Sequence, residues 1–416
     1  MLKTALLIVL VITWFPTSLF AGDEADRAFK FWQKALTDSS FLKSPNDLET
    51  AVQGLEFFWE QYPGHKDEDE VFMLLARLHA RLKQPQFQWN AFLRLVVLHG
   101  QSPLAPRARA RLDSLANYTT APLFSIRNIA GLNAFLDAEP ESDYRLAFIR
   151  YLDILITLDI PSLYVKTLQA CDLYLRKFTL EAPDADLVLY WRGLIKFRSE
   201  AFTAARYDFL LLHSVFPESR IIPNAIYQLA RITGKEHPEE AKAWLIELLN
   251  QYPDHELSDD AQFLFSELDY KSGRPDNALN DYRLLIKLFP QSPFCAKSML
   301  RMGQIQEDRG KFKEAVTAYR QVLLYPADDS TAKNALTRWI HVAADLLKNG
   351  VMEANARLAY VNRFPNASDA AGQLWRAAKL FEKAGRKKQA RALFKRLVDD
   401  YPASPHARKA IKQNNK

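Results

Sequence analysis

Glycine is scarce in this chain of 416 residues, and its spacing excludes several classes of enzyme. There are 13 glycines, and the closest two, Gly303 and Gly310, stand seven positions apart. No GxG, GxxG or GxxxxGK motif can therefore occur, which removes the glycine-rich loops that let a backbone approach a phosphate. The same spacing forbids the GxSxG turn that carries the nucleophile of many serine hydrolases. A nucleotide enzyme is not expected.

The chain also has few of the residues that form disulfides or bind metals. Only two cysteines are present, Cys171 and Cys295, which is too few for a disulfide framework. Metal sites need clustered ligands, and the histidines form no HxxxH pair and have no cysteine nearby, so neither a metal site nor a cofactor is expected. The eight histidines are His65, His79, His99, His213, His237, His255, His341 and His406.

The one long apolar run lies at the N-terminus. Lys3 precedes an uncharged run of eleven residues, Ala5 to Phe15, and Leu19-Phe20-Ala21 follows. This order is typical of a secretory signal peptide. Eleven residues at about 1.5 Å each reach about 17 Å, too short for a hydrocarbon core of ~30 Å. We therefore predict a signal peptide at 1–21, cleavage after Ala21, and a soluble exported chain without a transmembrane segment.

An aromatic residue followed by proline recurs along the mature chain. Successive prolines from Pro217 onward are separated by 36, 37, 36, 39 and 37 residues, and a regular period of this kind marks a repeat architecture. About ten units tile the mature chain. The pairs are Tyr62-Pro63, Phe216-Pro217, Tyr252-Pro253, Phe289-Pro290, Tyr325-Pro326, Phe364-Pro365 and Tyr401-Pro402.

Each unit also has a fixed spacing before its proline. Ala278, Tyr282, Leu285 and Pro290 stand at steps of four, three and five, and several other units repeat these steps. Steps of three and four place side chains on one helix face, with the small residue where a second helix comes close. Another small residue often stands twelve positions upstream, as Gly303 does before Ala315. The spacing predicts paired helices that cross at small residues and end at proline.

This pattern resembles the tetratricopeptide repeat (TPR), a helix-turn-helix unit with Ala, three residues, Phe and a final Pro. The variant here is similar to the repeats of bacterial periplasmic and outer-membrane assembly proteins. The resemblance implies an all-α, right-handed TPR-like α-solenoid of about ten helix pairs with a C-terminal cap helix, located in the periplasm. It also implies that each repeat contacts only its neighbours, so the two cysteines are expected to stay apart and reduced.

The repeats suggest three regions after the signal peptide. We expect an N-terminal TPR-like block at 22–118, irregular helical repeats at 119–183, and a C-terminal TPR block with its cap helix at 184–416. The pattern departs at 117–136, where polar, β-branched and proline residues disfavour a helix interior. We expect a loosened joint near residues 117–122.

Two glutamates followed by serine raise the alternative of an enzyme. Lytic transglycosylases use the Glu of such a pair, and the chain has Glu141-Ser142 and Glu218-Ser219. Both pairs follow a proline at an inter-repeat turn, whereas a general acid needs a burying pocket that raises its pKa. The repeats also leave no separate catalytic region, so we expect no enzymatic activity.

Partner binding is expected on the concave face, which the first helix of each pair lines. Exposed aromatics there are typical anchors for extended peptides or helices, and the competing interpretation is that they pack against neighbouring repeats. The expected groove residues are Tyr190, Leu194, Phe197, Phe263, Glu267, Tyr270, Trp375, Lys379 and Lys383.

Positive charge gathers in the last repeat. The net charge is +6, or +5 without Lys3; residues 375–416 hold 13 Lys and Arg against three acids, +10, which leaves −5 for residues 22–374. This uneven distribution disfavours nucleic acid as a partner. We expect Lys387, Lys388, Arg391 and Lys395 to contact an anionic envelope surface, unless they only keep a capping repeat in solution.

Taken together, these patterns favour an exported, non-enzymatic scaffold for protein–protein interactions in the bacterial cell envelope, acting in envelope or outer-membrane biogenesis. Two alternatives stay open. One is a glycan-binding superhelix related to lytic transglycosylases but without their catalytic domain. The other is a non-catalytic subunit of an envelope hydrolase.

Overall fold

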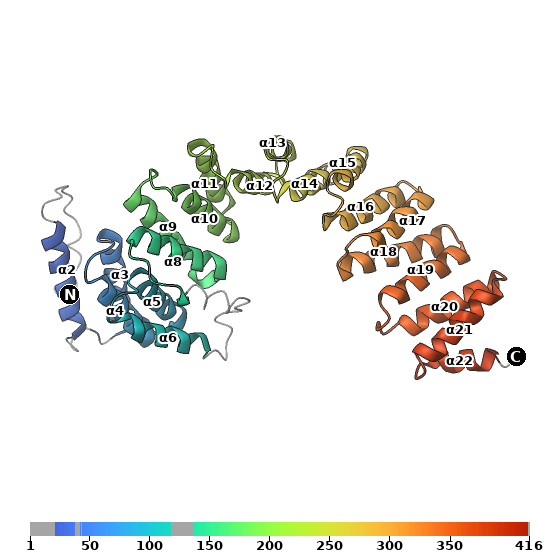
Figure 1. The fold of residues 1–416 in the computed structure, drawn as a ribbon, viewed down its shortest axis with the longest axis horizontal. Coiled ribbons are helices and arrows are strands. Elements are labelled where there is room, and N and C mark those ends of the chain that lie inside the picture. Colours follow the sequence, from blue (N-terminus) through green and yellow to red (C-terminus); the bar gives the residue numbers. More distant parts are fainter. Residues whose placement is uncertain (1–20, 38–41, 43, 118–135, 415–416) are drawn as a thin grey trace. The chain divides into compact units, whose positions relative to one another are not determined.

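The structure, a computed structural model, describes residues 21–37, 42, 44–117 and 136–414. Within these ranges it contains twenty α-helices and no strand (Figure 1), as the repeat pattern predicts. Most of the predicted signal peptide and residues 118–122 of the predicted joint lie outside the described residues. Their roles stay predictions.

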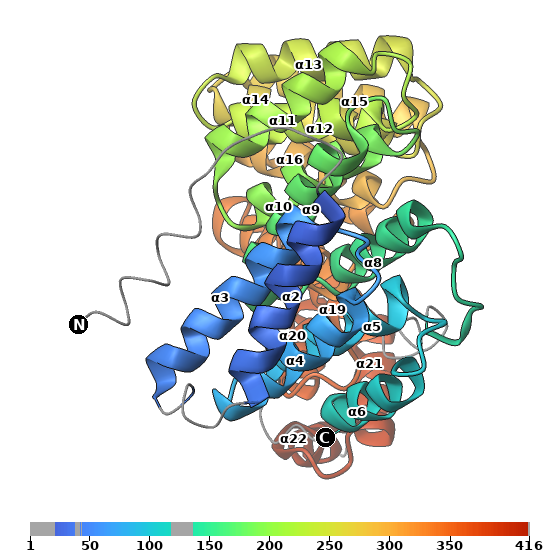
Figure 2. The same cartoon turned by 90° about the vertical axis from the view of Figure 1, so that its left-hand side faces the viewer.

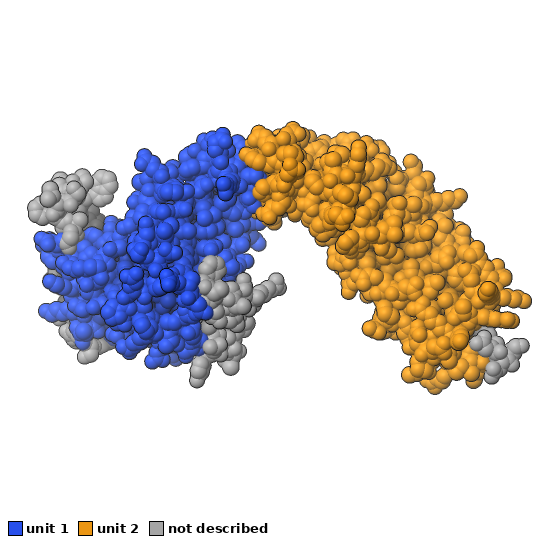
Figure 3. Space-filling model, viewed as in Figure 1, with its two compact units in different colours: residues 1–225 blue, residues 226–416 orange. Residues whose placement is uncertain are grey.

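The chain divides into two compact units, residues 1–225 and residues 226–416, which Figure 3 colours separately. The division falls inside the helix Ile222–Thr233. The two cysteines are free and buried, Cys171 in unit 1 and Cys295 in unit 2.

Unit 1 contains nine described helices before the dividing helix. They are α2 (Ala21–Thr37), α3 (Pro45–Gln61), α4 (Glu68–Arg81), α5 (Pro85–Leu98), α6 (Ala105–Asn117), α8 (Tyr144–Leu158), α9 (Tyr164–Phe178), α10 (Ala185–Arg198) and α11 (Phe202–Val215), with a 3-10 turn η2 (Pro161–Leu163). The next helix is α12 (Ile222–Thr233).

Unit 2 continues the succession of helices to the C-terminus. Its helices are α13 (Pro238–Gln251), α14 (Ser258–Lys271), α15 (Pro275–Leu288), α16 (Phe294–Asp308), α17 (Phe312–Gln321), α18 (Asp329–His341), α19 (Gly350–Arg363), α20 (Ala370–Lys383), α21 (Lys387–Asp400) and α22 (Pro405–Asn414). A 3-10 turn η3 (Val322–Leu324) follows α17, and a π-helical segment η4 (Val342–Leu346) follows α18.

In chain order these helices form nine complete pairs, from α2 with α3 to α20 with α21. Helix α6 is followed by residues outside the described ranges, and α22 is the cap helix. The prediction of about ten pairs with a C-terminal cap is therefore confirmed.

Most second helices end one residue before the aromatic of the aromatic-proline pair, as α15 does at Leu288. Helix α17 ends earlier, at Gln321, and a 3-10 turn fills the remaining distance to Tyr325.

The residues of the repeated motif form the core of each pair. Ala278, Tyr282 and Leu285 are fully buried, and the equivalent residues of the other regular repeats are at most 2% exposed. Ser404 caps α22, because its hydroxyl accepts from the Ala407 N–H. Ser292 instead accepts from the Phe294 N–H in the turn before α16, whose N-cap is Pro293.

Paired helices approach each other most closely at the predicted small residues. A Cβ added to Gly303 would stand 2.3 Å from the Tyr319 ring, and one added to Gly193 would stand 2.7 Å from the Phe209 ring. Each ring belongs to the second helix of the same pair, four residues after the motif alanine. The aromatic side chain therefore fills the space that the missing side chain of glycine leaves open.

Unit 1 differs from the predicted solenoid, because the pair formed by α8 and α9 contacts the pair formed by α2 and α3. Lys166 of α9 lies 3.0 Å from Glu56 of α3, and Lys177 of α9 donates to the carbonyl oxygen of Pro63. The expectation that each repeat contacts only its neighbours is thus wrong in this unit. The physical reason is that α8 packs directly against α5, which brings α9 beside α3.

A buried charge network lies where these helices meet. Arg94 of α5 is 1% exposed, and its guanidinium donates to the Glu56 carboxylate at 2.8 Å and to the Tyr151 hydroxyl at 3.1 Å. It also lies 4.0 Å from the centre of the Trp59 ring. Burial alone would raise the pKa of Glu56, but Arg94 and Lys166 lower it to about 2.

We predict that Gly303→Ala lowers the free energy of unfolding by about 1–3 kcal/mol, because the added methyl group overpacks the contact with the buried Tyr319 ring. Denaturant unfolding of the purified chain measures this change. Gly372→Ala is the matched control, since it is also a helix position but its Cβ would meet only His406 at 3.5 Å. Equal stability of the two variants would contradict the close-approach argument.

We also predict that Glu56→Gln costs about 3–5 kcal/mol at pH 7, because it leaves the buried Arg94 without a counter-ion. An ordinary Glu has a pKa of about 4.3, so ionised Glu56 stabilises the fold above that pH. The contribution is lost as the pH falls through the folded-state pKa of about 2. The difference in unfolding free energy between Glu56→Gln and the original chain should therefore shrink as the pH falls.

The exposed Glu49 lies on the same helix, and Glu49→Gln is the control for this second experiment. It should leave the unfolding free energy nearly unchanged at every pH. If Glu56→Gln lowers the unfolding free energy equally at pH 7 and at pH 3, then the shape of the Glu56 side chain, and not its charge, stabilises unit 1.

Candidate partner-binding surface

The nine predicted groove residues lie on the first helices of three pairs. Tyr190, Leu194 and Phe197 are on α10 in unit 1, whereas the other six are on α14 and α20 in unit 2. Within unit 2, α14, α16 and α18 contact one another in succession, as the first helices of a solenoid do.

On α10 the predicted residues are half-buried and take part in packing within their own pair. The Tyr190 ring lies 5.8 Å from the Phe209 ring, and the Phe197 ring lies 5.4 Å from the Phe202 ring. Each partner is on α11. These contacts support the packing interpretation for α10, while part of each side chain stays accessible.

On α14 the central predicted residue is a buried ion-pair partner. Glu267 is 7% exposed and accepts from the Tyr282 hydroxyl at 2.6 Å and from both Nε and Nη2 of Arg301, at 2.8 and 3.0 Å. Burial, and then the neighbouring Glu267, raise the pKa of Tyr282 well above its usual value. Phe263 is stacked on Phe294 at 4.7 Å. The α14 residues thus join their pair to α16.

On α20 the three predicted residues line one depression of about 410 Å³. Trp375 is half-buried against Phe394, and Lys379 and Lys383 are exposed. The remaining lining residues are Glu353, Arg376, Leu380 and Glu382. Three cations and two carboxylates surround one indole ring. The depression therefore combines an apolar aromatic surface with a rim of small net positive charge.

The predicted basic face on α21 is accessible. Lys387, Lys388, Arg391 and Lys395 are exposed, whereas Ala390, Phe394 and Leu397 on the opposite face of the same helix are buried. Among the described residues, none of the four cations forms an ion pair. By contrast, Arg396 pairs with Asp400 and donates to Asn362.

The two glutamate-serine pairs lie on the surface. Glu141 and Glu218 are both exposed, whereas a general acid of this kind lies in a burying pocket. The Ser219 hydroxyl donates to Asp186 of the preceding repeat and accepts from the Ile221 N–H. Ser219 therefore holds two repeats together.

Sequence reasoning missed the charged partners that complete these sites. Arg301 binds Glu267 from 34 positions away, and Arg338 binds Glu307 from 31 positions away. A carboxylate and an arginine about one repeat apart are the signal that would have identified them. Arg376, which lines the depression on α20, follows directly after a predicted residue but was not recognised.

The described helices define the class of the protein, which is a helical-repeat protein. Sequence comparison shows which family parts of the chain resemble. Residues 263–332 and 374–404 match the sequence models of the tetratricopeptide repeat. These two segments are similar to tetratricopeptide repeats, and proteins of that family act as scaffolds for protein interactions.

No curated protein matches the chain in the sequence search. Solved structures that resemble it include the C-terminal part of a TPR repeat-containing protein from Cytophaga hutchinsonii (15% identity, 63% of this chain and 98% of that one, TM-score 0.42). PilF of Pseudomonas aeruginosa has 11% identity over 54% of this chain and 94% of its own, with a TM-score of 0.39. YrrB, described as a TPR protein with an unusual peptide-binding site, has 17% identity over 47% and 91%, with a TM-score of 0.36.

None of the described helices combines the length and the apolar composition needed to cross a bilayer.

Proposed function

We propose that this protein is a non-enzymatic scaffold of the bacterial cell envelope whose unit 2 binds an extended peptide or a helix of a partner protein. The depression on α20 carries the proposal. Trp375 offers an accessible aromatic surface, and Lys379 and Lys383 stand one and two helical turns further along the same face. An aromatic anchor beside accessible charges is the arrangement that interface hot spots use.

The charges of the depression favour a partner segment with acidic side chains. Arg376, Lys379 and Lys383 exceed the carboxylates of Glu353 and Glu382 by one positive charge. One of these cations is already paired, because Lys379 contacts Glu382. An acidic side chain of the partner would therefore meet Arg376 and Lys383 with the least competition.

The envelope location rests on the predicted signal peptide and on the resemblance to periplasmic and outer-membrane assembly proteins. The non-enzymatic role is supported by the exposed positions of Glu141 and Glu218. A protein that meets other envelope components through accessible surfaces is consistent with both.

We predict that Lys379→Glu/Lys383→Glu lowers affinity for the envelope protein that the chain retains, and that Trp375→Ala costs more than about 2 kcal/mol of binding. The measurement is titration of the purified partner by calorimetry, with the thermal midpoint of each variant recorded as well. Trp375 also packs against Phe394, so some loss of stability is expected for its variant but not for the lysine pair.

Lys271→Glu/Lys287→Glu is the matched control, because it reverses two exposed lysines of unit 2 that do not line the depression. This control should bind as the original chain does. Unchanged affinity in the Trp375 and lysine variants, with lowered thermal midpoints, would assign these side chains to packing and reject the proposed binding site.

We also propose that the basic face of α21, formed by Lys387, Lys388, Arg391 and Lys395, contacts an anionic envelope surface. Reversing all four to glutamate should abolish retention on envelope fractions at low salt while leaving helicity intact. Because the Debye length is about 8 Å at physiological salt, such a face acts at contact range, and retention of the original chain should fall as salt rises.

A second quadruple variant separates position from net charge. Reversing Lys235, Lys271, Lys287 and Lys313 changes the net charge by the same amount, and all four side chains are exposed elsewhere in unit 2. It should retain most of its binding. If the two quadruple variants lose retention equally, or if retention of the original chain does not respond to salt, α21 is only a solvated face.

A further inference from the structure

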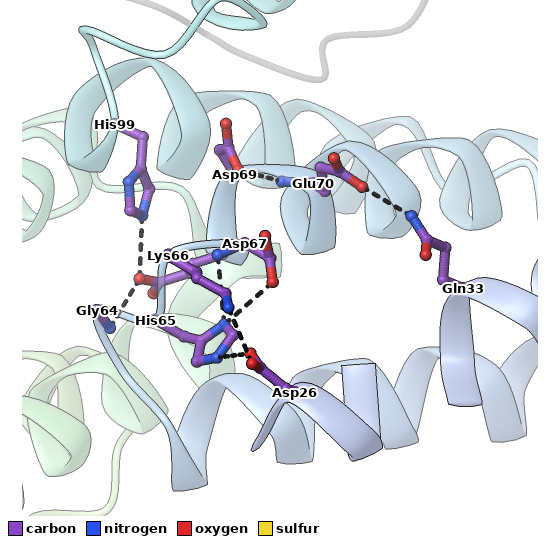
Figure 4. Close-up of polar contacts among 10 residues, drawn as sticks. Asp26, Gln33, Gly64, His65, Lys66, Asp67, Asp69, Glu70 and His99 are labelled. Carbon is purple, nitrogen blue, oxygen red and sulfur yellow. Dashed lines mark hydrogen bonds and ion pairs between the residues drawn. The ribbon is translucent and has the colours of Figure 1, made fainter. Parts of the chain in front are cut away.

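Asp26, His65 and Asp67 form a polar cluster in unit 1 (Figure 4). Asp26 belongs to α2, and the other two residues belong to the loop between α3 and α4. One potential metal-ligand atom of each side chain lies within 4.8 Å of those of the other two. Asp26 is 39 positions from His65 in the sequence, so this cluster exists only because α2 packs along α3 (Figure 2).

The packing that brings α2 to this loop is specific. Phe29 of α2 meets Phe58 of α3 at 6.0 Å, and the Trp32 ring occupies the space where Gly54 has no side chain. These contacts hold the Asp26 carboxylate beside the imidazole, where its Oδ1 lies 3.1 Å from His65 Nε2.

The imidazole is oriented by its own loop. The Asp67 N–H donates to His65 Nδ1 at 3.3 Å, and the ring meets Phe58 edge-on at 5.4 Å. The loop is fixed in turn by Glu68, a fully buried carboxylate that accepts from the Gly64 N–H at 2.8 Å. Gly64 has φ +81, which suits glycine. Packing and hydrogen bonds therefore hold the metal-binding side chains in position without a bound ion.

The cluster is open to solvent on one side. The side chain of His65 is 11% exposed, and those of Asp26 and Asp67 are 32% and 31% exposed. An ion could therefore enter without opening the core, and water could complete its coordination. One imidazole with two carboxylates is a donor set that suits Zn²⁺ and similar transition-metal ions, whereas Mg²⁺ and Ca²⁺ prefer oxygen ligands alone.

A lysine currently satisfies part of the negative charge. Lys66 Nζ lies 2.9 Å from Asp26 Oδ2, and this hydrogen bond is the main cause that lowers the pKa of Asp26. The Lys66 side chain is 66% exposed. An exposed ion pair contributes little to stability, so a divalent ion can displace the ammonium group into water at small cost.

We propose that Asp26, His65 and Asp67 bind one divalent transition-metal ion of the Zn²⁺ type, which replaces the Lys66 ammonium and fastens α2 to the loop between α3 and α4. The site is independent of the partner-binding depression, which lies in unit 2. Its role is to stabilise the docking of α2. The coordinating ring nitrogen must carry no proton, so a neutral His65 keeps its one proton on the other ring nitrogen, whereas an imidazolium releases one proton on binding.

Titration calorimetry of the purified chain with ZnCl2 tests the proposal. We expect one Zn²⁺ per chain, at least about tenfold weaker binding in His65→Ala and in Asp26→Asn, and tighter binding in Lys66→Ala. MgCl2 should not bind at this site. Zn²⁺ should also slow amide hydrogen exchange in α2 of the original chain but not in His65→Ala.

His255→Ala is the matched control. His255 also stands three residues after a Tyr-Pro tyrosine, and the Leu257 N–H donates to its Nδ1 at 3.2 Å, as in the loop of His65. Leucine replaces Asp67 at this equivalent position, so His255→Ala should leave Zn²⁺ binding unchanged. Absence of Zn²⁺ binding in both the original chain and Lys66→Ala would overturn the proposal. Binding that survives in His65→Ala would overturn it as well.

Discussion

The close approach of two helices at a small residue is the constraint on which the rest of the structure depends. Gly193 and Gly303 leave room for the rings of Phe209 and Tyr319, and Gly54 does the same for Trp32. Such an approach lets an aromatic side chain fill the interior of each pair without voids. The motif alanines and leucines are buried as a consequence. Neighbouring helix pairs then pack through the helix faces that the contact within each pair leaves accessible.

Buried ion pairs connect helices that are distant in the sequence, and they do so differently in the two units. In unit 2, Glu267 and Arg301 join one pair to the next, one repeat away. In unit 1, Glu56 accepts from Arg94 and also contacts Lys166, which brings three pairs together. A buried charge that loses its partner is costly, so these networks specify which helices meet as well as how strongly they pack.

The proposed partner-binding surface lies where side chains stay exposed after the helices have packed. On α14 the side chain of Glu267 is buried and bound to other residues of unit 2. On α20, by contrast, Lys379 and Lys383 stay exposed beside Trp375. The equivalent helix position thus carries a buried carboxylate on α14 and an exposed ammonium group on α20. On α14, Arg301 of the following first helix neutralises the carboxylate of Glu267.

The sequence by itself determined the helix pairs, their number and their cores. Local spacing is sufficient for this, because Ala278, Tyr282 and Leu285 share one face of a helix whatever surrounds them. Only the tertiary structure decided that α9 meets α3, that Trp375, Lys379 and Lys383 line one depression, and that Asp26 reaches His65. The two contacts join residues that are 39 or more positions apart in the sequence, and the depression forms where Glu353 of α19 approaches α20. No local period records that packing.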